Sequence, residues 1–329
     1  MRSATEPGVL PISGPGATAT TRAQGPFLYV GGYLRLSEYA YGTSKPLRTI
    51  KPGSNAVALT LDSSGNLFAG DGNPSYGTID VYEARNLKLL RRIYIDGPQA
   101  MAVDGLGYLY VANGGPDIEV YTPGGIKKVR TIKRRVTNAV ALVFDHSGLL
   151  YVANAAGSVV VYGPTQTPGK MKFLRRITDG IKGPDALVFG PSRHLFVANW
   201  PSRGRASVSV YAHRSSSPQW IVGGDIKAPR ALAVDSVGRL FVACSPFGRI
   251  AGHNHGWVTV YAPGSTKPLR KITEGIDAPY ALAIDPSNNI YVANGERRSV
   301  TVYSPGGAHL LRKITKGVDG PASLVFSSQ

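Results

Sequence analysis

Pro229-Arg-Ala-Leu-Ala-Val-Asp-Ser-Val-Gly-Arg-Leu-Phe-Val-Ala-Cys244 is the stretch that decides the fold, because variants of it recur along the whole chain. Six internal copies follow the pattern Pro-x-Ala-Leu-x-apolar-Asp-x-x-Gly-x-Leu-Tyr-Val-Ala-Asn, at intervals of 41 to 50 residues. A seventh copy begins at Pro321 and stops at the chain end. Self-similarity at this period is typical of β-propellers, whereas parallel β-helices repeat at much shorter intervals.

Each repeat contains four short apolar runs. They are the Ala-Leu run, the Leu-Tyr-Val-Ala-Asn run, a run ending in Val-Tyr, and a run reading Leu-Arg-x-Ile. β-Branched and aromatic residues dominate them, and Gly, Pro or Asn bounds them, which indicates strands. Asp-x-x-Gly between the first two runs is typical of a tight hairpin turn. The sequence therefore predicts blades of four strands.

The chain ends decide how many blades there are. Phe27 to Gly32 matches a second strand, and residues 38–50 match residues 260–272 nearly one for one. The first strand of that blade is missing at the N-terminus, and residues 323–327 fit it. We therefore expect an all-β fold, one seven-bladed propeller over residues 26–329, in which the C-terminal strand joins the N-terminal blade and closes the ring.

Residues 1–25 differ in composition from the rest of the chain. They are rich in Gly, Pro, Ala, Ser and Thr and lack periodicity, so we expect a disordered tail or linker. They contain no continuous apolar region of the kind a signal peptide requires. The chain also has no apolar run long enough for a transmembrane helix, and its single cysteine, Cys244, allows no internal disulfide.

The chain is strongly basic, with a net charge of +17 and a pI near 10.0. Such a charge favours anionic partners, including nucleic acid, anionic polysaccharide or an acidic membrane surface. Many of the basic residues fall on the predicted outermost strands, where charge also discourages edge-to-edge aggregation. Blade three is denser, and we interpret this cluster as a second polyanion contact; its members are Lys127, Lys128, Lys133, Arg134 and Arg135.

Features repeated in most blades are best explained by structure. The Asn that ends the second strand and the Asp of Asp-x-x-Gly are both predicted to shape turns, and the tyrosine of Val-Tyr is predicted to pack between blades. Departures from the repeat are the better guide to a binding site. They gather in blades five to seven on the predicted top face, which we define as the face that carries the loops between strands two and three and between strands four and one. The candidate ligand-binding residues there are Trp200, Arg203, Arg205, Arg230, Phe247, Arg249, His253, His255, Trp257, Tyr280, Arg297 and Arg298.

Arginine beside an aromatic face suits anionic, planar or sugar-like ligands. His253 and His255 are spaced for a metal, but no third ligand is identifiable, so we expect no metal site and no cofactor. Cys244 ends a core strand and is expected to be a small buried apolar residue. No catalytic set stands out, and we predict no catalytic residues.

The repeat resembles the NHL-type propeller repeats of exported bacterial proteins. Ala-Leu-Ala-Val-Asp at 231–235, Leu-Tyr-Val-Ala-Asn at 109–113 and 150–154, and Val-Thr-Val-Tyr-Ala-Pro-Gly at 258–264 carry the resemblance. It implies a propeller fold and an extracytoplasmic location. A more distant similarity to streptogramin lyases and gluconolactonase-type lactonases implies that enzymatic relatives exist.

Three hypotheses follow. The first is a non-catalytic, monomeric binding or scaffold propeller that recognises an anionic, glycan or protein ligand through its top face. The second is a metal-dependent lactonase or lyase at the channel mouth, which requires acidic and histidine side chains to converge there. The third is an RNA-binding propeller, which requires a contiguous basic top face.

Overall fold

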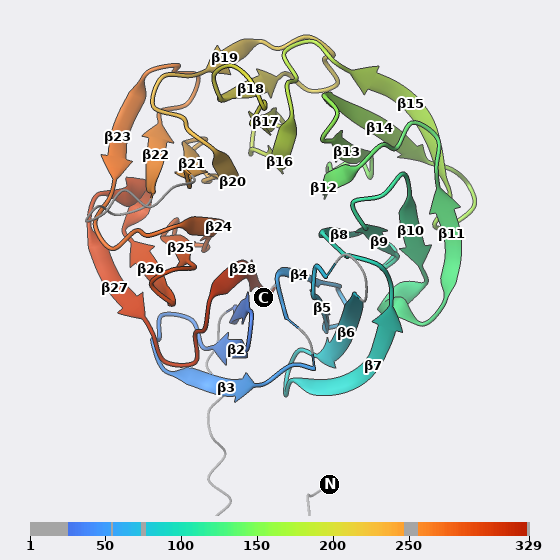
Figure 1. Cartoon of the computed structure of the whole chain (residues 1–329), viewed down its shortest axis with the longest axis horizontal. Helices are drawn as coiled ribbons and strands as arrows, with labels where there is room; N and C mark the ends of the chain where they lie inside the picture. The colour runs from blue at the N-terminus through green and yellow to red at the C-terminus, as the bar shows by residue number, and fades with distance from the viewer. Residues whose placement is uncertain (1–25, 54, 74–76, 247–255, 328–329) are drawn as a thin grey trace, which may run out of the picture.

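The computed structural model describes residues 26–53, 55–73, 77–246 and 256–327. These residues form seven four-stranded antiparallel sheets arranged as blades around a common centre (Figure 1). The predicted tail over 1–25 lies outside the described residues, as do Phe247, Arg249, His253 and His255. No helix in the described part of the chain is long and apolar enough to cross a membrane.

Every blade places its first strand at the centre of the ring and its fourth strand at the rim (Figure 1). From the centre outward, blade 1 contains β28 (Pro321–Phe326), β1 (Leu28–Gly32), β2 (Leu36–Tyr39) and β3 (Pro46–Ile50), and blade 2 contains β4 (Ala58–Leu61), β5 (Asn66–Gly70), β6 (Thr78–Glu83) and β7 (Lys88–Tyr94). Blade 3 contains β8 (Ala100–Val103), β9 (Leu109–Ala112), β10 (Ile118–Tyr121) and β11 (Lys128–Ile132). Blade 4 contains β12 (Ala139–Phe144), β13 (Leu150–Asn154), β14 (Ser158–Pro164) and β15 (Met171–Ile177).

Blades 5 to 7 follow the same order. They are β16 (Pro184–Phe189), β17 (Leu195–Asn199), β18 (Ser207–Tyr211) and β19 (Trp220–Val222); β20 (Pro229–Val234), β21 (Leu240–Cys244), β22 (Trp257–Tyr261) and β23 (Pro268–Ile272); and β24 (Pro279–Ile284), β25 (Ile290–Asn294), β26 (Ser299–Tyr303) and β27 (Leu310–Ile314). Two short 3-10 turns, η1 (Pro123–Gly125) and η2 (Pro305–Gly307), connect third and fourth strands.

The predicted ring closure is confirmed. β28 pairs antiparallel with β1, placing Leu28 opposite Phe326 and Val30 opposite Leu324. Backbone bonds between Phe27 and Ser327 extend the pairing, since the Ser327 N–H donates to the Phe27 carbonyl at 2.9 Å. Blade 1 is thus built from both ends of the chain, and its β1 gains a hydrogen-bonded neighbour on each side.

The core lies between neighbouring blades. Seven clusters of buried apolar side chains fill these seams, and each cluster joins the facing surfaces of two adjacent sheets. The third-strand tyrosines are buried there as predicted, with Tyr162, Tyr211, Tyr261 and Tyr303 each 1% exposed. Their hydroxyls donate to backbone carbonyls of the loop that enters the blade, as Tyr211 does to Asp179 at 2.5 Å. Burial of these rings, together with the aliphatic side chains of each cluster, stabilises the seams.

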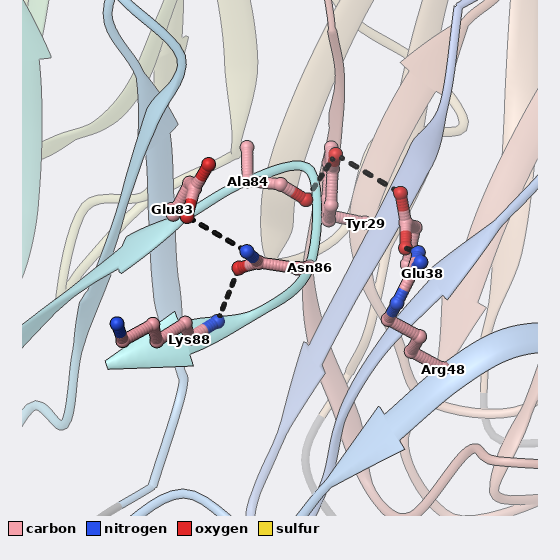
Figure 2. A network of polar contacts seen from close by, with 7 residues as sticks. All are labelled: Tyr29, Glu38, Arg48, Glu83, Ala84, Asn86 and Lys88. Carbon is pink, nitrogen blue, oxygen red and sulfur yellow. Dashed lines mark hydrogen bonds and ion pairs between the residues drawn. The ribbon is translucent and has the colours of Figure 1, made fainter. Parts of the chain in front are cut away.

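The seam between blades 1 and 2 contains a departure from this apolar pattern (Figure 2). Glu38 occupies the position that valine holds in the other third strands, and its side chain is 1% exposed. Arg48 pairs with it at 2.6 Å, and the Tyr29 hydroxyl, which faces the same carboxylate, donates to the Ala84 carbonyl of blade 2 at 2.9 Å. A buried charge is therefore retained only with a close cationic partner.

Several arginines of the fourth strands are packed against their own blade and do not serve only as edge charges. The Arg175 guanidinium lies 5.9 Å from the centre of the Tyr151 ring, and Arg312 lies 5.6 Å from that of Tyr291. Arg312 also donates to the Tyr291 hydroxyl at 2.7 Å. The arginine of Leu-Arg-x-Ile therefore covers the aromatic residue of the second strand, which accounts for part of the basic rim.

Candidate functional site

The Asn residues that end the second strands are loop clamps. Asn199 accepts a hydrogen bond from the Lys182 backbone N–H at 3.0 Å and donates to the Gly180 carbonyl at 3.2 Å. The side-chain oxygens of Asn154 and Asn294 likewise each accept a hydrogen bond from a backbone N–H of the loop that enters their own blade, at 2.9 and 3.0 Å. All three are at most 1% exposed. The predicted structural role of these residues is confirmed, and the clamps bring the loop before strand one beside the loop after strand two.

The aspartates of Asp-x-x-Gly are turn residues, as predicted. The Asp285 carboxylate accepts hydrogen bonds from the backbone N–H groups of Ser287 and Asn289 at 2.9 and 2.8 Å. In the neighbouring blade 6, Asp235 accepts in the same way from Val237 and Arg239. Cys244 is fully buried, and burial raises the pKa of its thiol to about 11. It is therefore protonated at neutral pH and packs as an apolar residue.

Two rings of positions surround the channel mouth on the top face. In five of the seven blades the N–H of the residue after the second strand donates to a carbonyl of the incoming loop, as the Trp200 N–H does to the Gly183 carbonyl at 2.8 Å. This first ring contains Tyr33, Gly72, Gly114, Ala155, Trp200, Ser245 and Gly295. The second ring, which enters the first strands, contains Val57, Gln99, Val140, Asp185, Arg230, Tyr280 and Ala322.

Blades 2 to 4 fill both rings with small or uncharged residues, whereas the large aromatic and charged residues occur in blades 5, 6, 7 and 1. We call this set the mouth arc, and its members are Tyr33, Asp185, Trp200, Arg230 and Tyr280. The four blades are neighbours around the ring, so the arc is continuous (Figure 1). The mouth-arc residues therefore form one surface across neighbouring blades. A residue with a purely structural role would be repeated in every blade, and these residues are not.

Trp200 and Arg230 form the centre of the mouth arc. The Arg230 guanidinium carbon lies 4.3 Å from the centre of the Trp200 ring, a stacking contact between blades 5 and 6. Asp185 is half-buried beside them; burial raises the pKa of its carboxyl, and the charge of Arg230 opposes that rise. The planar cation thus stacks on an aromatic face, which keeps the guanidinium oriented, and it interacts electrostatically with a partly desolvated acid.

Two tyrosines complete the mouth arc. Tyr280 lies against Gly295, where a Cβ atom would come within 2.5 Å of the ring, and Tyr33 lies equally close to Gly320 at 2.4 Å. Burial raises the pKa of Tyr280, Tyr33 and Glu296 raise it further, and the charge of Arg230 opposes the rise. Tyr33 is 49% exposed, so its ring faces solvent beside the mouth. Only glycine at these two positions leaves room for the rings to approach the backbone this closely.

The sequence-predicted residues therefore separate into four groups. Trp200, Arg230 and Tyr280 come together in the mouth arc. Arg203 and Arg205 are exposed in the loop after Trp200. The remaining described residues, Arg297, Arg298 and Trp257, have identifiable local partners. Phe247, Arg249, His253 and His255 stay predictions, because they lie outside the described residues.

The two arginines of blade 7 bind acidic residues of the incoming loops. Arg297 pairs with Asp277 at 3.2 Å, and Arg298 pairs with Asp319 at 3.4 Å. Both arginines are exposed, and the Arg298 pair links blade 7 to blade 1. Their charges are compensated on the top face, which gives them a local role in holding the loops together.

Trp257 replaces the missing clamp of blade 6. Its indole N–H donates to the Asp225 carbonyl and to the Thr259 hydroxyl, each at 3.1 Å, and Lys271 lies 3.9 Å above its ring. Cys244 stands where blades 4, 5 and 7 have the Asn clamp, and its thiol, a weak donor, reaches the Asp225 carbonyl of the incoming loop only at 3.9 Å. Trp257 therefore holds the incoming loop of blade 6 and belongs to the blade rather than to the mouth arc.

Sequence reasoning placed Tyr33 and Asp185 outside the candidate set. Tyr33 was recognisable, because residues 28–32 align with the other second strands and the next position is small in five of the seven blades. Asp185 has no comparable sequence signal, since its importance depends on burial beside Arg230. Among the described residues, no group of three or more His, Cys, Asp or Glu side chains could hold a metal ion.

No protein-family model matches the chain, and no curated protein is detectably similar to it in sequence. Solved structures are similar in fold. A Lactobacillus plantarum protein has a TM-score of 0.77 at 19% identity, covering 93% of this chain and 100% of its own. A functionally unknown protein from Desulfotomaculum acetoxidans has a TM-score of 0.74 at 14% identity, covering 91% and 98%.

A third similar structure is the periplasmic gluconolactonase of Pseudomonas aeruginosa, with a TM-score of 0.64 at 19% identity, covering 92% of this chain and 99% of that one. At these identities the likeness establishes the propeller fold alone. With 1544 chains of solved structures matching, the fold is too common to indicate one function. The prediction of a seven-bladed propeller is confirmed, and its function has to be argued from the mouth arc.

Proposed function

We propose that this chain is a non-catalytic binding propeller whose mouth arc recognises a small sugar acid, that is, a saccharide ring carrying a carboxylate. The observation that carries the proposal is the oriented Arg230 guanidinium, stacked 4.3 Å from Trp200 at a channel mouth that also presents two tyrosine rings. Aromatic faces suit the apolar face of a sugar ring, and a guanidinium suits a carboxylate through two parallel hydrogen bonds.

Each member of the mouth arc has a role in this proposal. Arg230 binds the carboxylate, and Tyr280 and Tyr33 provide platforms for the ring. Asp185 accepts hydrogen bonds from sugar hydroxyls and holds the guanidinium in place. Arg203 and Arg205, exposed beside Trp200, add long-range attraction for an anion.

The experiment is isothermal titration calorimetry with glucuronate, and with glucose as the neutral ligand of the same ring. We expect glucuronate to bind and glucose to bind at least tenfold more weakly, because a charge-assisted hydrogen bond contributes about 1.5–3 kcal/mol. Arg230→Gln should abolish the preference for glucuronate, whereas Arg298→Gln, which removes a compensated top-face arginine, should preserve it. Equal binding of both sugars by the wild-type protein would refute the proposal.

The lactonase or lyase alternative is tested in the same preparation. Glucono-δ-lactone is followed by the release of acid at constant pH, with and without added divalent metal. Our proposal predicts the uncatalysed rate in every case. Catalysed hydrolysis that Asp185→Asn abolishes would contradict the non-catalytic part of the proposal and favour the enzymatic alternative.

We also propose that the repeat is of the NHL type and that the protein works outside the cytoplasm as a monomer. The motifs at 109–113, 231–235 and 258–264 support the first point. Ring closure leaves no open sheet edge between the first and last blades, and this supports the proposal that the protein is a monomer.

A further inference from the structure

The rim of blades 3 and 4 carries a second basic surface, separate from the mouth arc. A groove of about 700 Å³ opens there, lined by the outer strands β11 and β15 and the segment that follows β11. The two strands stand next to each other on the rim (Figure 1). We call this the rim groove, and its basic lining residues are Arg130, Lys133, Arg134, Lys170 and Lys172.

The rim groove differs from the neighbouring rim in its charge balance. No Asp or Glu is among its described lining residues. In blades 1 and 2, by contrast, an acid of the third strand compensates a base of the fourth, as Glu38 does for Arg48 and Asp80 does for Arg92, each at 2.6 Å. In blade 3 the corresponding pair, Glu119 with Lys128 at 3.0 Å, lies outside the groove lining. Blade 4, like blades 5 to 7, has no acid in its third strand, so its basic residues have no such acid beside them.

The aromatic lining of the rim groove is already covered. The Arg134 and Arg135 guanidiniums lie 5.3 and 5.1 Å from the centre of the Phe173 ring. Tyr162, the other lining aromatic residue, is 1% exposed and meets Phe173 edge-on. Single-stranded nucleic acid is usually held by bases that stack on open aromatic faces. The groove instead offers oriented guanidiniums and flexible ammonium groups, which suit tetrahedral oxyanions.

From this arrangement we propose that the rim groove binds an anionic polysaccharide bearing sulfate or phosphate groups. Phe173 holds the two arginines in place, and Lys133, Lys170 and Lys172 are exposed on the groove walls, where they meet charges along an extended chain. Binding here would attach the propeller to a polyanionic surface and leave the mouth arc open on the top face. The proposal does not depend on the sugar-acid site.

A heparin octasaccharide is the probe, titrated into the full chain at 50 and 200 mM NaCl. The groove variant combines Lys133→Gln, Arg134→Gln, Lys170→Gln and Lys172→Gln. The matched control removes the same number of exposed rim charges from blades 6 and 7 and combines Lys267→Gln, Arg270→Gln, Lys313→Gln and Lys316→Gln. Thermal unfolding of all three proteins verifies that each variant is folded.

We expect the wild-type protein and the control to bind with dissociation constants within threefold of each other, and the groove variant to bind at least tenfold more weakly. Binding should weaken steeply at the higher salt concentration. An equal loss in both variants would overturn the proposal, because net charge alone would then explain binding. Tighter binding of an oligothymidylate of equal charge, lost in the groove variant, would overturn it in favour of nucleic acid. Glucuronate titration of the groove variant keeps the two sites distinguishable, since its mouth arc is intact.

Discussion

Replacing Asn154 with alanine tests whether the Asn clamps are structural. The side chain is 1% exposed, and it accepts a hydrogen bond from the Thr137 N–H at 2.9 Å and donates to the Arg135 carbonyl at 3.1 Å. A weaker contact reaches the Ser158 hydroxyl at 3.3 Å. The substitution leaves the N–H of Thr137 without this acceptor, which costs about 1–3 kcal/mol, and each further bond lost costs about 1 kcal/mol. We therefore expect a loss of about 3 kcal/mol.

The measurement is urea unfolding, supported by the shift in melting temperature, which for a chain of this size should be roughly 6 °C. Asn113→Ala is the matched control, because Asn113 holds the same position in blade 3 but is only half-buried. Its side-chain oxygen accepts from Gly115 at 3.0 Å, within its own loop, and does not join two loops. We expect it to lose less than about 1 kcal/mol. Equal losses in the two variants would refute the clamp.

Two further predictions concern carboxylates, the half-buried Asp185 and the fully buried Glu38. Asp185→Asn should raise the melting temperature at pH 7: burial raises the pKa of this acid, so the folded state loses stability as the pH rises through the interval from the unfolded to the folded pKa. The gain should vanish in melting curves recorded below that interval, and a gain that persists there would contradict the assignment. Arg48→Met should cost about 2 kcal/mol, because it strands the buried Glu38 carboxylate, whereas adding Glu38→Val, the residue of the other blades, should recover most of that loss in urea unfolding.

The fold was predictable because the same sequence pattern of strands and turns occurs in every repeat. Strand positions, the Asp-x-x-Gly turns and the closure by residues 323–327 all depend on local patterns that several copies repeat, so a weak copy is recognised from the others. The Asn clamps were predictable for the same reason. A role shared by Asn154, Asn199 and Asn294 is visible as a conserved position within one chain.

The site was only partly predictable, because contacts between loops of different blades are not encoded in local patterns. Trp257 looked like a ligand contact, yet it replaces the clamp that Cys244 cannot make. Arg297 and Arg298 looked available, yet their partners come from loops about twenty residues away in either direction. Asp185 is a candidate because burial raises the pKa of its carboxyl, and the residues next to it in the sequence do not indicate that burial.

The most direct test of the central claim, that departures from the repeat on adjacent blades form the ligand site, is a fluorescence titration in which Trp200 alone reports. The chain has three tryptophans. The Trp200 signal is obtained in the Trp220→Phe background by subtracting the response of the protein that also carries Trp200→Phe, which keeps the Trp257 clamp in place. Glucuronate should change the Trp200 emission saturably, glucose should not, and Arg230→Gln should abolish the response. An emission that glucuronate leaves unchanged, or a response that survives Arg230→Gln, would contradict the account.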